Sequence, residues 1–501
     1  MTGPDVSASS EAMDTVHALI ARHDPERELA PCGLRRLVLG HDVLDDVTGT
    51  VAELLELRAE PGTPVGGARP RVTLLVDRVT IRRGADDVKD LVERSLAEKF
   101  DVRREVLDDG HSELHVVDDV LDQATAACRA ADAVVALGGG TISDIGKVAA
   151  QRANLAGRPP VLVSVQTAAS VDGYTDDVSV LLRDGVKRTV PSRWPDAVVA
   201  DAGTIADAPP VMNRAGFGEM TSMLTAPADW ALAALVGTEQ KFHEAPLRLL
   251  EAVGEGIETW SPGVGRGEPE AIEQLTRALA VRGIVTGVAG TTATLSGLEH
   301  LVSHMLDLHH AAHGLPTGLH GAQVGVAGLV AASAWEMLHE RIAASTVPPR
   351  LCEEAFDASR ARVAVTEAFG SLDPEGRIAK ECWADYEVKL ASVAANRGRV
   401  EAMLTTWSDH APRLRSLVRP SSELAASLRA ARASAMFAEL DPAVSDDLAA
   451  WAVANCGLMR NRFTVADLLT LLGWWEPADV AEVLDRARSA AGSARAAEVE
   501  A

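Results

Sequence analysis

The sequence contains few cysteines and no long apolar run. Its five cysteines, Cys32, Cys128, Cys352, Cys382 and Cys456, are scattered and form no CxxC pair. This spacing argues against a disulfide framework and against a zinc site built from thiolates. No apolar segment is long enough for a transmembrane helix, and the acidic N-terminus lacks the basic and apolar regions of a secretory signal. We therefore expect a cytoplasmic protein without a membrane span.

Positive charge is also scarce in this chain. Forty-eight Lys and Arg residues stand against seventy-two Asp and Glu residues, which gives a formal net charge of −24. A field of this sign repels a phosphate polymer, and no local basic patch interrupts it. Nucleic acid is therefore not an expected partner. The chain could still bind a small anionic ligand, because a few hydrogen-bond donors in a cleft can outweigh the repulsion by the net negative charge.

The remaining composition predicts a globular protein with a large core. The 501 residues are 47% apolar and 24% charged, which excludes disorder of the whole chain and suggests two or three domains. From about residue 35 to 165, short β-branched runs alternate with helical runs, as in a doubly wound parallel sheet. The strand candidates are 35–39, 72–76, 102–107, 133–137 and 161–165. The helix candidates between them are 43–57, 86–100, 117–130 and 143–150.

The second half of the chain has a different character. After an expected hairpin at 179–189 and a strand at 197–201, helical periodicity dominates, for example at 220–235, 271–286, 324–338, 377–397 and 421–440. We therefore expect an α/β N-terminal Rossmann-like domain followed by an all-α domain, with the active site in the cleft between them. The expected boundaries are a polar tail at 1–30, a dinucleotide-binding domain at 31–205, a helical metal- and substrate-binding domain at 206–490, and a tail at 491–501.

An apolar strand candidate runs directly into three glycines. Gly138, Gly139 and Gly140 follow the strand and precede a helix that contains Asp144. Glycines at this place let backbone N–H groups and the helix N-terminus approach an anion closely, which suits a pyrophosphate. The segment is neither a Walker loop nor a GxGxxG fingerprint, so a turn that serves only the strand-to-helix geometry is the alternative interpretation.

Three histidines occur at a spacing that suits a metal. His300 and His304 lie four residues apart and share one helix face, and His320 lies directly before the next helical segment. Histidines placed in this way, together with a carboxylate, make a three-ligand site with open positions for a substrate oxygen. Glu219, at the start of the helical half, offers that carboxylate. An ordinary helix face is the alternative for the histidine pair alone.

The ordered motifs resemble those of one enzyme family. The segments are 138–144, 167–173, 215–219, 296–304 and 319–321, and together they resemble the glycerol-1-phosphate dehydrogenases. That family belongs to the larger group of iron-containing alcohol dehydrogenases, glycerol dehydrogenase and dehydroquinate synthase. The resemblance covers about residues 30 to 330, and the helical region beyond 330 resembles the family chiefly around Arg460 and Arg462.

The resemblance implies a role for each matching residue. It assigns the pyrophosphate to Gly138, Gly139, Gly140 and Asp144, the adenosine ribose to Asp77, and the nicotinamide to Thr167 and Ser170. It assigns one divalent metal to Glu219, His300 and His320. Asp172, which approaches the substrate or the nicotinamide, and His304, near the substrate, are the implied catalytic residues.

Two enzyme classes in this group share the nicotinamide and the metal. At the position of Glu219 the dehydrogenases usually have Asp, whereas the synthases have Glu, as this chain does. At the position of Ala322 many relatives have Glu. The synthases resemble one another in a lysine three residues after the metal-binding glutamate, where this chain has Ser222. Glu219 and Ala322 depart from the dehydrogenases, but Ser222 and the absence of the synthases' asparagine and glycine before His300 favour a dehydrogenase. A dehydroquinate synthase-like cyclase and a catalytically silent binding protein are the alternatives.

The expected reaction follows from this resemblance. It implies oxidation of a small polyol phosphate, similar to glycerol-1-phosphate, or reduction of the corresponding ketone, with NAD or NADP as cofactor. Asp77 favours NAD, because a carboxylate accepts a hydrogen bond from a ribose hydroxyl and repels a 2′-phosphate. The expected metal is zinc, with iron and nickel as alternatives, because two imidazoles and one carboxylate suit all three. The protein could assemble as a homodimer.

Overall fold

The computed structural model describes residues 7–58, 69–111, 113–154, 158–183 and 186–500. The chain forms two compact units. The first comprises Met1–Gly216 and Arg266–Gly290, and the second comprises Phe217–Gly265 and Thr291–Ala501. This division differs from the expected boundary at 205, because helix α11 (Pro269–Ala289) packs against elements of the first unit. Three prolines and three glycines in residues 61–71 predict an exposed loop, and this segment lies largely outside the described residues.

The first unit is built on a parallel sheet, as predicted. Among the described residues the sheet has six strands in the order β1-β10-β7-β6-β2-β5, all parallel to their neighbours. Their bounds are β1 (Arg36–Gly40), β2 (Arg71–Val76), β5 (Asp101–Val106), β6 (Ala133–Gly138), β7 (Val161–Gln166) and β10 (Ala197–Asp201). Two antiparallel pairs accompany it, β3 (Arg82–Arg83) with β4 (Asp86–Asp87), and β8 (Val178–Arg183) with β9 (Val186–Pro191). Every strand predicted from the sequence is present.

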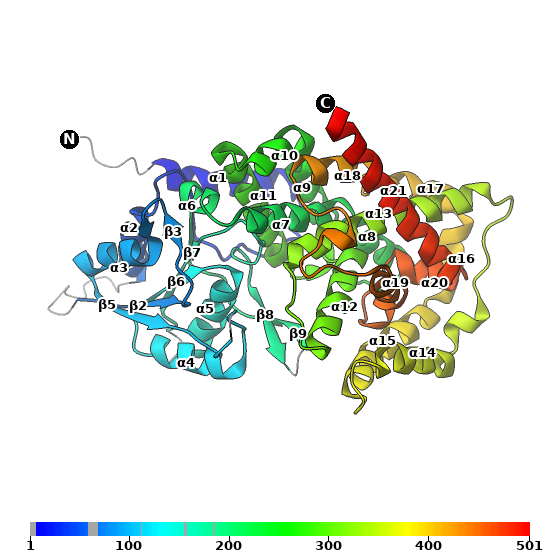
Figure 1. Ribbon diagram of the computed structural model, residues 1–501, viewed down its shortest axis with the longest axis horizontal. Coiled ribbons are helices and arrows are strands. Elements are labelled where there is room, and N and C mark those ends of the chain that lie inside the picture. Colours follow the sequence, from blue (N-terminus) through cyan, green and yellow to red (C-terminus); the bar gives the residue numbers. More distant parts are fainter. Residues whose placement is uncertain (1–6, 59–68, 112, 155–157, 184–185, 501) are drawn as a thin grey trace. The chain divides into compact units, whose positions relative to one another are not determined.

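Helices cover both faces of this sheet. The helices of the unit are α1 (Ser7–His23), α2 (Asp46–Arg58), α3 (Val88–Lys99), α4 (Asp118–Cys128), α5 (Gly140–Arg152), α6 (Ala202–Ala206) and α11. Side chains alternate across a strand, so Leu74 packs with α2 and α3 while Leu75 packs with α4 and α5. Figure 1 shows the two helix pairs on opposite sides of β2 and β6. Burial on both faces explains why these strands read as continuous apolar runs.

The N-terminal segment, for which the sequence allows a polar tail or a loosely docked helix, forms a helix. Helix α1 carries Met13 and Val16, both buried, in a cluster with Leu37 of β1, Val198 of β10 and Ile284 of α11. The helix therefore packs on the core of the first unit from residue 13 onward. Two apolar side chains one turn apart are a weak pattern in the sequence, and their partners lie more than twenty residues away.

A buried lysine joins two segments of the first unit. Lys147 of α5 is fully buried (0% exposed), and its Nζ lies 3.2 Å from Asp144 Oδ1 and 2.7 Å from Asp176 Oδ1. The same ammonium donates to the carbonyl oxygens of Gly173, at 2.7 Å, and of Val178. Burial raises the pKa of Asp176 to about 7, although the charge of Lys147 opposes that shift. The lysine thus ties α5 to the chain between β7 and β8.

The second unit is helical, as predicted. It begins within α7 (Pro210–Met220) and continues through η1 (Thr221–Leu224), α8 (Ala226–Val236), α9 (Glu244–Gly254), α10 (Ile257–Arg266), η2 (Thr292–Thr294), α12 (Leu298–Ala312), α13 (His320–Ala344), η3 (Glu353–Phe356), α14 (Ala358–Gly370), α15 (Arg377–Ala395), α16 (Arg397–Thr405), α17 (Trp407–Ser416), α18 (Ser421–Ala430), η4 (Phe437–Glu439), α19 (Asp446–Asn455), η5 (Cys456–Leu458), α20 (Val465–Leu471) and α21 (Pro477–Glu500). No helix in the described ranges is long and apolar enough to cross a bilayer.

Two of the predicted helices are interrupted in the structure. The segment 220–235 contains the 3-10 turn η1 before α8, and Pro227 lies in the first turn of α8, where its missing N–H is tolerated. The segment 421–440 is helical only to Ala430, because Arg432 adopts a left-handed backbone with φ of 51°. The apolar spacing continues across both breaks, which is why periodicity alone predicts longer helices.

We predict that Lys147→Met destabilises the first unit strongly. The variant leaves Asp144 and Asp176 buried without the ammonium, and breaking a buried ion pair costs about 3 to 5 kcal/mol. Urea unfolding followed by circular dichroism measures the change. Lys99→Met, at an exposed position in the last turn of α3, is the control and should change the unfolding free energy by less than about 0.5 kcal/mol. Equal stability of the two variants would show that the buried cluster contributes nothing.

Candidate active site

Three of the predicted cofactor segments lie at one edge of the sheet. Asp77 follows β2, the three glycines end β6 and begin α5, and Thr167 follows β7. The strands are adjacent in the order β7-β6-β2 and parallel, so their carboxyl ends share one edge. Neighbouring strands lie about 4.8 Å apart. The structure therefore brings the three segments together side by side, and their roles toward the nicotinamide, the pyrophosphate and the ribose stay predictions.

The glycine turn has open space at its centre. Gly139 precedes the first residue of α5, and a Cβ added to it would meet nothing within 4 Å. A Cβ on Gly138 would lie 2.8 Å from Ile142 Cγ1, and one on Gly140 would lie 2.8 Å from Val171 Cγ2. The outer glycines are therefore required by packing. The central one lies at a helix N-terminus, whose exposed N–H groups and dipole favour an anion.

The carboxylate of Asp77 is held by a buried lysine. Lys89 of α3 places its Nζ 2.6 Å from Asp77 Oδ1, and the Val79 N–H donates to the same oxygen at 3.1 Å. Lys89 also donates to the backbone oxygens of Asp77, at 2.7 Å, and of Val79. Within the described residues, Asp77 Oδ2 accepts no hydrogen bond. The pair fixes the orientation of one oxygen and leaves the other available to a ligand.

Asp144 and Asp172 make protein contacts that the sequence does not predict. Asp144 Oδ2 accepts the Val180 N–H of the β8–β9 hairpin at 3.1 Å, so this carboxylate braces the hairpin as well as pairing with Lys147. Asp172 Oδ2 lies 3.2 Å from Nη2 of Arg282, a fully buried residue of α11. The expected roles of the two aspartates toward the cofactor stay predictions. Thr167 and Ser170, which follow β7 in the chain, are both buried.

A close contact between two helix backbones builds the predicted metal cluster. Helix α7 carries Glu219 in its last turn, and α13 begins with His320. A Cβ on Gly218 would lie only 2.3 Å from the carbonyl oxygen of Gly321, and one on Gly325 would lie 2.9 Å from Gly218 Cα. Only glycine permits this approach, which positions Glu219 beside His320. Helix α12, which packs against α13, supplies His300.

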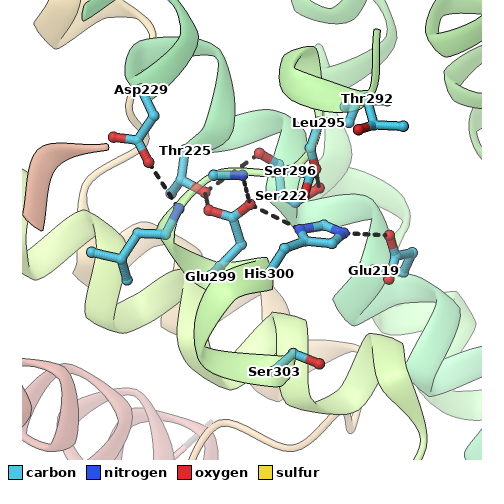
Figure 2. Close-up of polar contacts among 12 residues, drawn as sticks. Glu219, Ser222, Thr225, Asp229, Thr292, Leu295, Ser296, Glu299, His300 and Ser303 are labelled. Atoms are coloured by element: carbon cyan, nitrogen blue, oxygen red, sulfur yellow. Dashed lines mark hydrogen bonds and ion pairs between the residues drawn. The ribbon is translucent and has the colours of Figure 1, made fainter. Parts of the chain in front are cut away.

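The three predicted ligands converge in the structure. One ligand atom each of Glu219, His300 and His320 lies within 4.8 Å of the other two. Glu219 Oε1 is 3.4 Å from His300 Nε2, and Oε2 is 3.6 Å from His320 Nε2. Ligands about 2 Å from a tetrahedral ion lie about 3.3 Å apart, so these separations fit a first-row metal. Figure 2 shows the carboxylate of Glu219 facing the His300 ring.

The opposite ring nitrogens of both histidines are occupied. His300 Nδ1 lies 3.0 Å from Glu299 Oε1, and His320 Nδ1 lies 2.9 Å from Ser303 Oγ, which itself donates to Gln323 Oε1 at 2.6 Å. Both Nδ1 atoms therefore act as donors, and both Nε2 atoms face Glu219. Burial lowers the pKa of His300, but the charges of Glu219 and Glu299 outweigh it and raise the pKa to about 9. This excess of acceptor groups suits a cation.

The second histidine of the pair lies beside the cluster. The ring of His304 is half-buried, and its centroid is 6.3 Å from that of His300 and 5.8 Å from that of His320. Its expected role near the substrate stays a prediction. A second group that could hold a metal, Asp109 with His111 and His115, lies in a more exposed loop after β5. There the carboxylate already accepts two backbone N–H groups, so the buried cluster is the stronger candidate.

Sequence reasoning did not predict the residues that support the cluster. Glu299, Ser303 and Gln323 orient the two imidazoles, and Arg462 donates to Ser296 O and Oγ and, at 2.9 Å, to Thr292 Oγ1, in the segment before α12. A glutamate directly before the first histidine in an otherwise apolar helix start was the available signal. Arg460 lies 3.7 Å from Asp385, in the type of ion pair that surface arginines commonly form.

Comparison with known proteins agrees with this geometry. Residues 64–209 match the family model described as iron-containing alcohol dehydrogenase. A glycerol-1-phosphate dehydrogenase (NAD(P)+) of Natronomonas pharaonis is 30% identical over 350 residues, which cover 68% of this chain and 90% of the relative. The chain belongs to the glycerol-1-phosphate dehydrogenase family. With the enzyme of the same name from Bacillus velezensis the identity is 33%, over 49% of this chain and 58% of that protein.

Solved structures share the fold of this family member. A glycerol dehydrogenase from Schizosaccharomyces pombe aligns with a TM-score of 0.56 and 15% identity, over 92% of this chain and 91% of that protein. A probable glycerol dehydrogenase from Sinorhizobium meliloti aligns with a TM-score of 0.52 and 16% identity, over 92% and 98% of the two chains. At this identity the likeness shows the fold alone.

We predict that Gly139→Val weakens dinucleotide binding without unfolding the protein. The branched side chain enters the open space at the N-terminus of α5, where the phosphates are expected and where its Cβ would meet no protein atom within 4 Å. We expect a loss of at least about tenfold in affinity, or ~1.4 kcal/mol. Calorimetry with NADH and NADPH measures it. Gly49→Val, at an exposed helical glycine that is equally open, is the control. Unchanged affinity in a folded Gly139 variant would refute the pyrophosphate assignment.

We predict that His320→Ala removes most of the bound metal. A site that loses one of three protein ligands rarely retains a first-row ion, so occupancy should fall below about one tenth of the wild-type value. Elemental analysis after gel filtration measures the occupancy. His313→Ala, an exposed histidine at the end of α12, serves as the control and should retain the metal. Full occupancy in His320→Ala would rule out the proposed ligand set.

Proposed function

We propose that this protein is a metal-dependent NAD(P)-linked dehydrogenase that interconverts a small secondary alcohol phosphate, such as glycerol-1-phosphate, and its ketone. The observation that carries the proposal is the convergence of Glu219, His300 and His320 in a chain of this family. The relatives bear the name glycerol-1-phosphate dehydrogenase, and 30% identity over 90% of one of them supports the same reaction here.

The edge of the sheet supports the dinucleotide half of the proposal. The turn around Gly139 would hold the pyrophosphate, with the adenosine toward β2 and the nicotinamide toward β7. Asp77 Oδ2 would accept a ribose hydroxyl. We propose NAD as the better cofactor, although the ammonium of Lys89, 2.6 Å from Oδ1, offsets part of the repulsion that Asp77 exerts on a 2′-phosphate. NADP therefore stays open as a second cofactor.

The buried cluster supports the metal half. A divalent ion held there by Glu219, His300 and His320 supplies Lewis acidity toward a substrate hydroxyl, while the nicotinamide accepts or donates the hydride. Zinc is the proposed metal, because two imidazoles and one carboxylate with open positions are a common zinc ligand set; iron and nickel accept the same donors. His304, beside both ligand histidines, is the proposed proton relay or phosphate contact. Asp172 is proposed to lie near the nicotinamide.

The cyclase alternative lacks support at one position. Ser222 stands where the synthases have a substrate-binding lysine, and it is fully buried, with its Oγ donating to the Leu295 carbonyl oxygen at 2.9 Å. This hydroxyl braces the segment before α12, and it offers no positive charge to an anionic substrate. A redox enzyme is therefore the better proposal than a cyclase. We also propose that the protein forms a homodimer and is located in the cytoplasm.

We expect the metal-loaded protein to oxidise one NADH for each dihydroxyacetone phosphate that it reduces. Here the cofactor is a cosubstrate that leaves the site, so the nicotinamide absorbance must fall in step with product formation. Dihydroxyacetone without the phosphate should react with a kcat/KM lower by about tenfold or more, since a charged contact contributes about 1.5 to 3 kcal/mol. The His320→Ala protein is the control. Many turnovers of any keto phosphate with no net absorbance change would replace this proposal with the cyclase.

A further inference from the structure

We propose that Glu299 is a positioning residue of the metal centre, which holds His300 in the tautomer that presents Nε2 to the metal. The inference rests on the metal site proposed above and goes beyond its three ligands. Glu299 directly precedes His300 in α12 and is fully buried (0% exposed). Figure 2 shows its carboxylate between the His300 ring and the start of the helix.

The carboxylate of Glu299 is bent back over the N-terminus of α12. The Gly297 N–H donates to Oε1 at 2.7 Å, and His300 Nδ1 lies 3.0 Å from the same oxygen. The other oxygen, Oε2, accepts a hydrogen bond from Thr225 Oγ1 at 3.1 Å. A carboxylate is also favoured at this place by the helix dipole. Each oxygen thus has a donor, so the side chain is fixed in one orientation.

This geometry decides which nitrogen of His300 carries the proton. A carboxylate only accepts hydrogen bonds, so His300 Nδ1 must donate, and in the neutral ring that would bind a metal the lone pair is on Nε2. Nε2 lies 3.4 Å from Glu219 Oε1, on the side of the proposed metal. Without the acceptor at Nδ1, the single proton of the neutral ring could move to Nε2 and bond to Glu219, which would oppose metal binding. The acceptor therefore contributes to metal affinity although it does not touch the metal.

The fold gives Glu299 the space that this role needs. A Cβ on Gly297 would lie 3.0 Å from Glu299 Oε2 and 2.6 Å from Asp229 Oδ2. Asp229 accepts the Leu298 N–H at 2.9 Å and the Val465 N–H at 2.9 Å, and thereby fixes the starts of α12 and α20. Burial and then the charge of Glu299 raise the pKa of Asp229 to about 8. The two carboxyl groups hold the first turn of α12 from both sides.

The two proposed metal-binding histidines differ in the hydrogen-bond acceptor at Nδ1. The Nδ1–H of His320 donates to the neutral hydroxyl of Ser303, whereas that of His300 donates to a carboxylate. A carboxylate behind a ligand histidine orients the ring and raises its basicity, and its loss commonly costs 10- to 100-fold in metal affinity. We therefore expect His300 to depend on its partner more than His320 does.

A pair of variants of similar size tests the assignment. Glu299→Gln retains a carbonyl oxygen that can accept from Gly297 and His300, while its amide can donate to Thr225 Oγ1. Glu299→Leu fills the same space and removes the acceptor. In titrations of the metal-free proteins with Co²⁺, followed by the cobalt absorption spectrum, we expect about 10- to 100-fold weaker binding for Leu and less than about tenfold for Gln.

Two further measurements separate this role from packing. Thr225→Val removes the hydrogen bond to Oε2 without touching His300 and should leave Co²⁺ affinity within about threefold of wild type. Nitrogen-15 spectra of histidine-labelled metal-free protein, recorded at a pH above the pKa of His300, should show that the His300 Nδ1–H tautomer is retained in Glu299→Gln and lost in a soluble Glu299→Leu or, if that variant does not fold, Glu299→Ala. The resonance is assigned by its absence in His300→Gln.

The outcomes distinguish this proposal from the proposed function. If the wild-type protein and Glu299→Leu bind Co²⁺ equally, or if the tautomer does not change, the role of Glu299 is overturned while the metal site stands. If the wild-type protein binds no Co²⁺ that depends on His320, the metal site fails and this inference fails with it. Weak binding in Glu299→Leu with recovery in Glu299→Gln supports the assignment.

Discussion

The metal cluster depends on one contact between two helix backbones. Three side chains from α7, α12 and α13 can meet within 4.8 Å only because Gly218 allows the end of α7 to touch the start of α13 at Gly321. A side chain at this contact would separate the helices by at least the width of a methyl group, and Glu219 would no longer reach His320. The glycines that flank the ligands are therefore as necessary to the cluster as the ligands themselves.

Buried charge is the second constraint, and each unit satisfies it in its own way. In the first unit, the fully buried Lys147 forms an ion pair with Asp176, and the fully buried Arg282 forms one with Asp172. These pairs connect helices to the chain after β7, where the nicotinamide is expected. In the second unit, carboxylates outnumber cations around the start of α12, and imidazoles and backbone N–H groups supply the remaining donors. A divalent cation completes that balance.

The sequence predicts the sheet from local patterns, because buried parallel strands appear as apolar runs. It predicts the ligand set through the resemblance of ordered motifs to one family, since the histidine spacing alone also suits an ordinary helix face. The docking of α1 and the place of α11 in the first unit leave no such pattern, and the support of His300 by Glu299 leaves only a glutamate directly before the histidine. Each depends on a partner far along the chain or on a buried orientation, as Met13 with Ile284 illustrates. Periodicity also continues through the break at Arg432, where only the backbone angle ends the helix.

The net charge of −24 bears on how the proposed ligands bind. A field of this sign raises the local concentration of divalent cations and lowers that of phosphorylated substrates and dinucleotides. Binding of the anions must therefore come from short-range donors, which act where the dielectric constant is low and screening is weak. The open N-terminus of α5 at Gly139 provides such donors for a pyrophosphate. For the proposed substrate, the charge of a bound metal would offset that of Glu219, so metal binding and substrate binding would be coupled by electrostatics in addition to coordination.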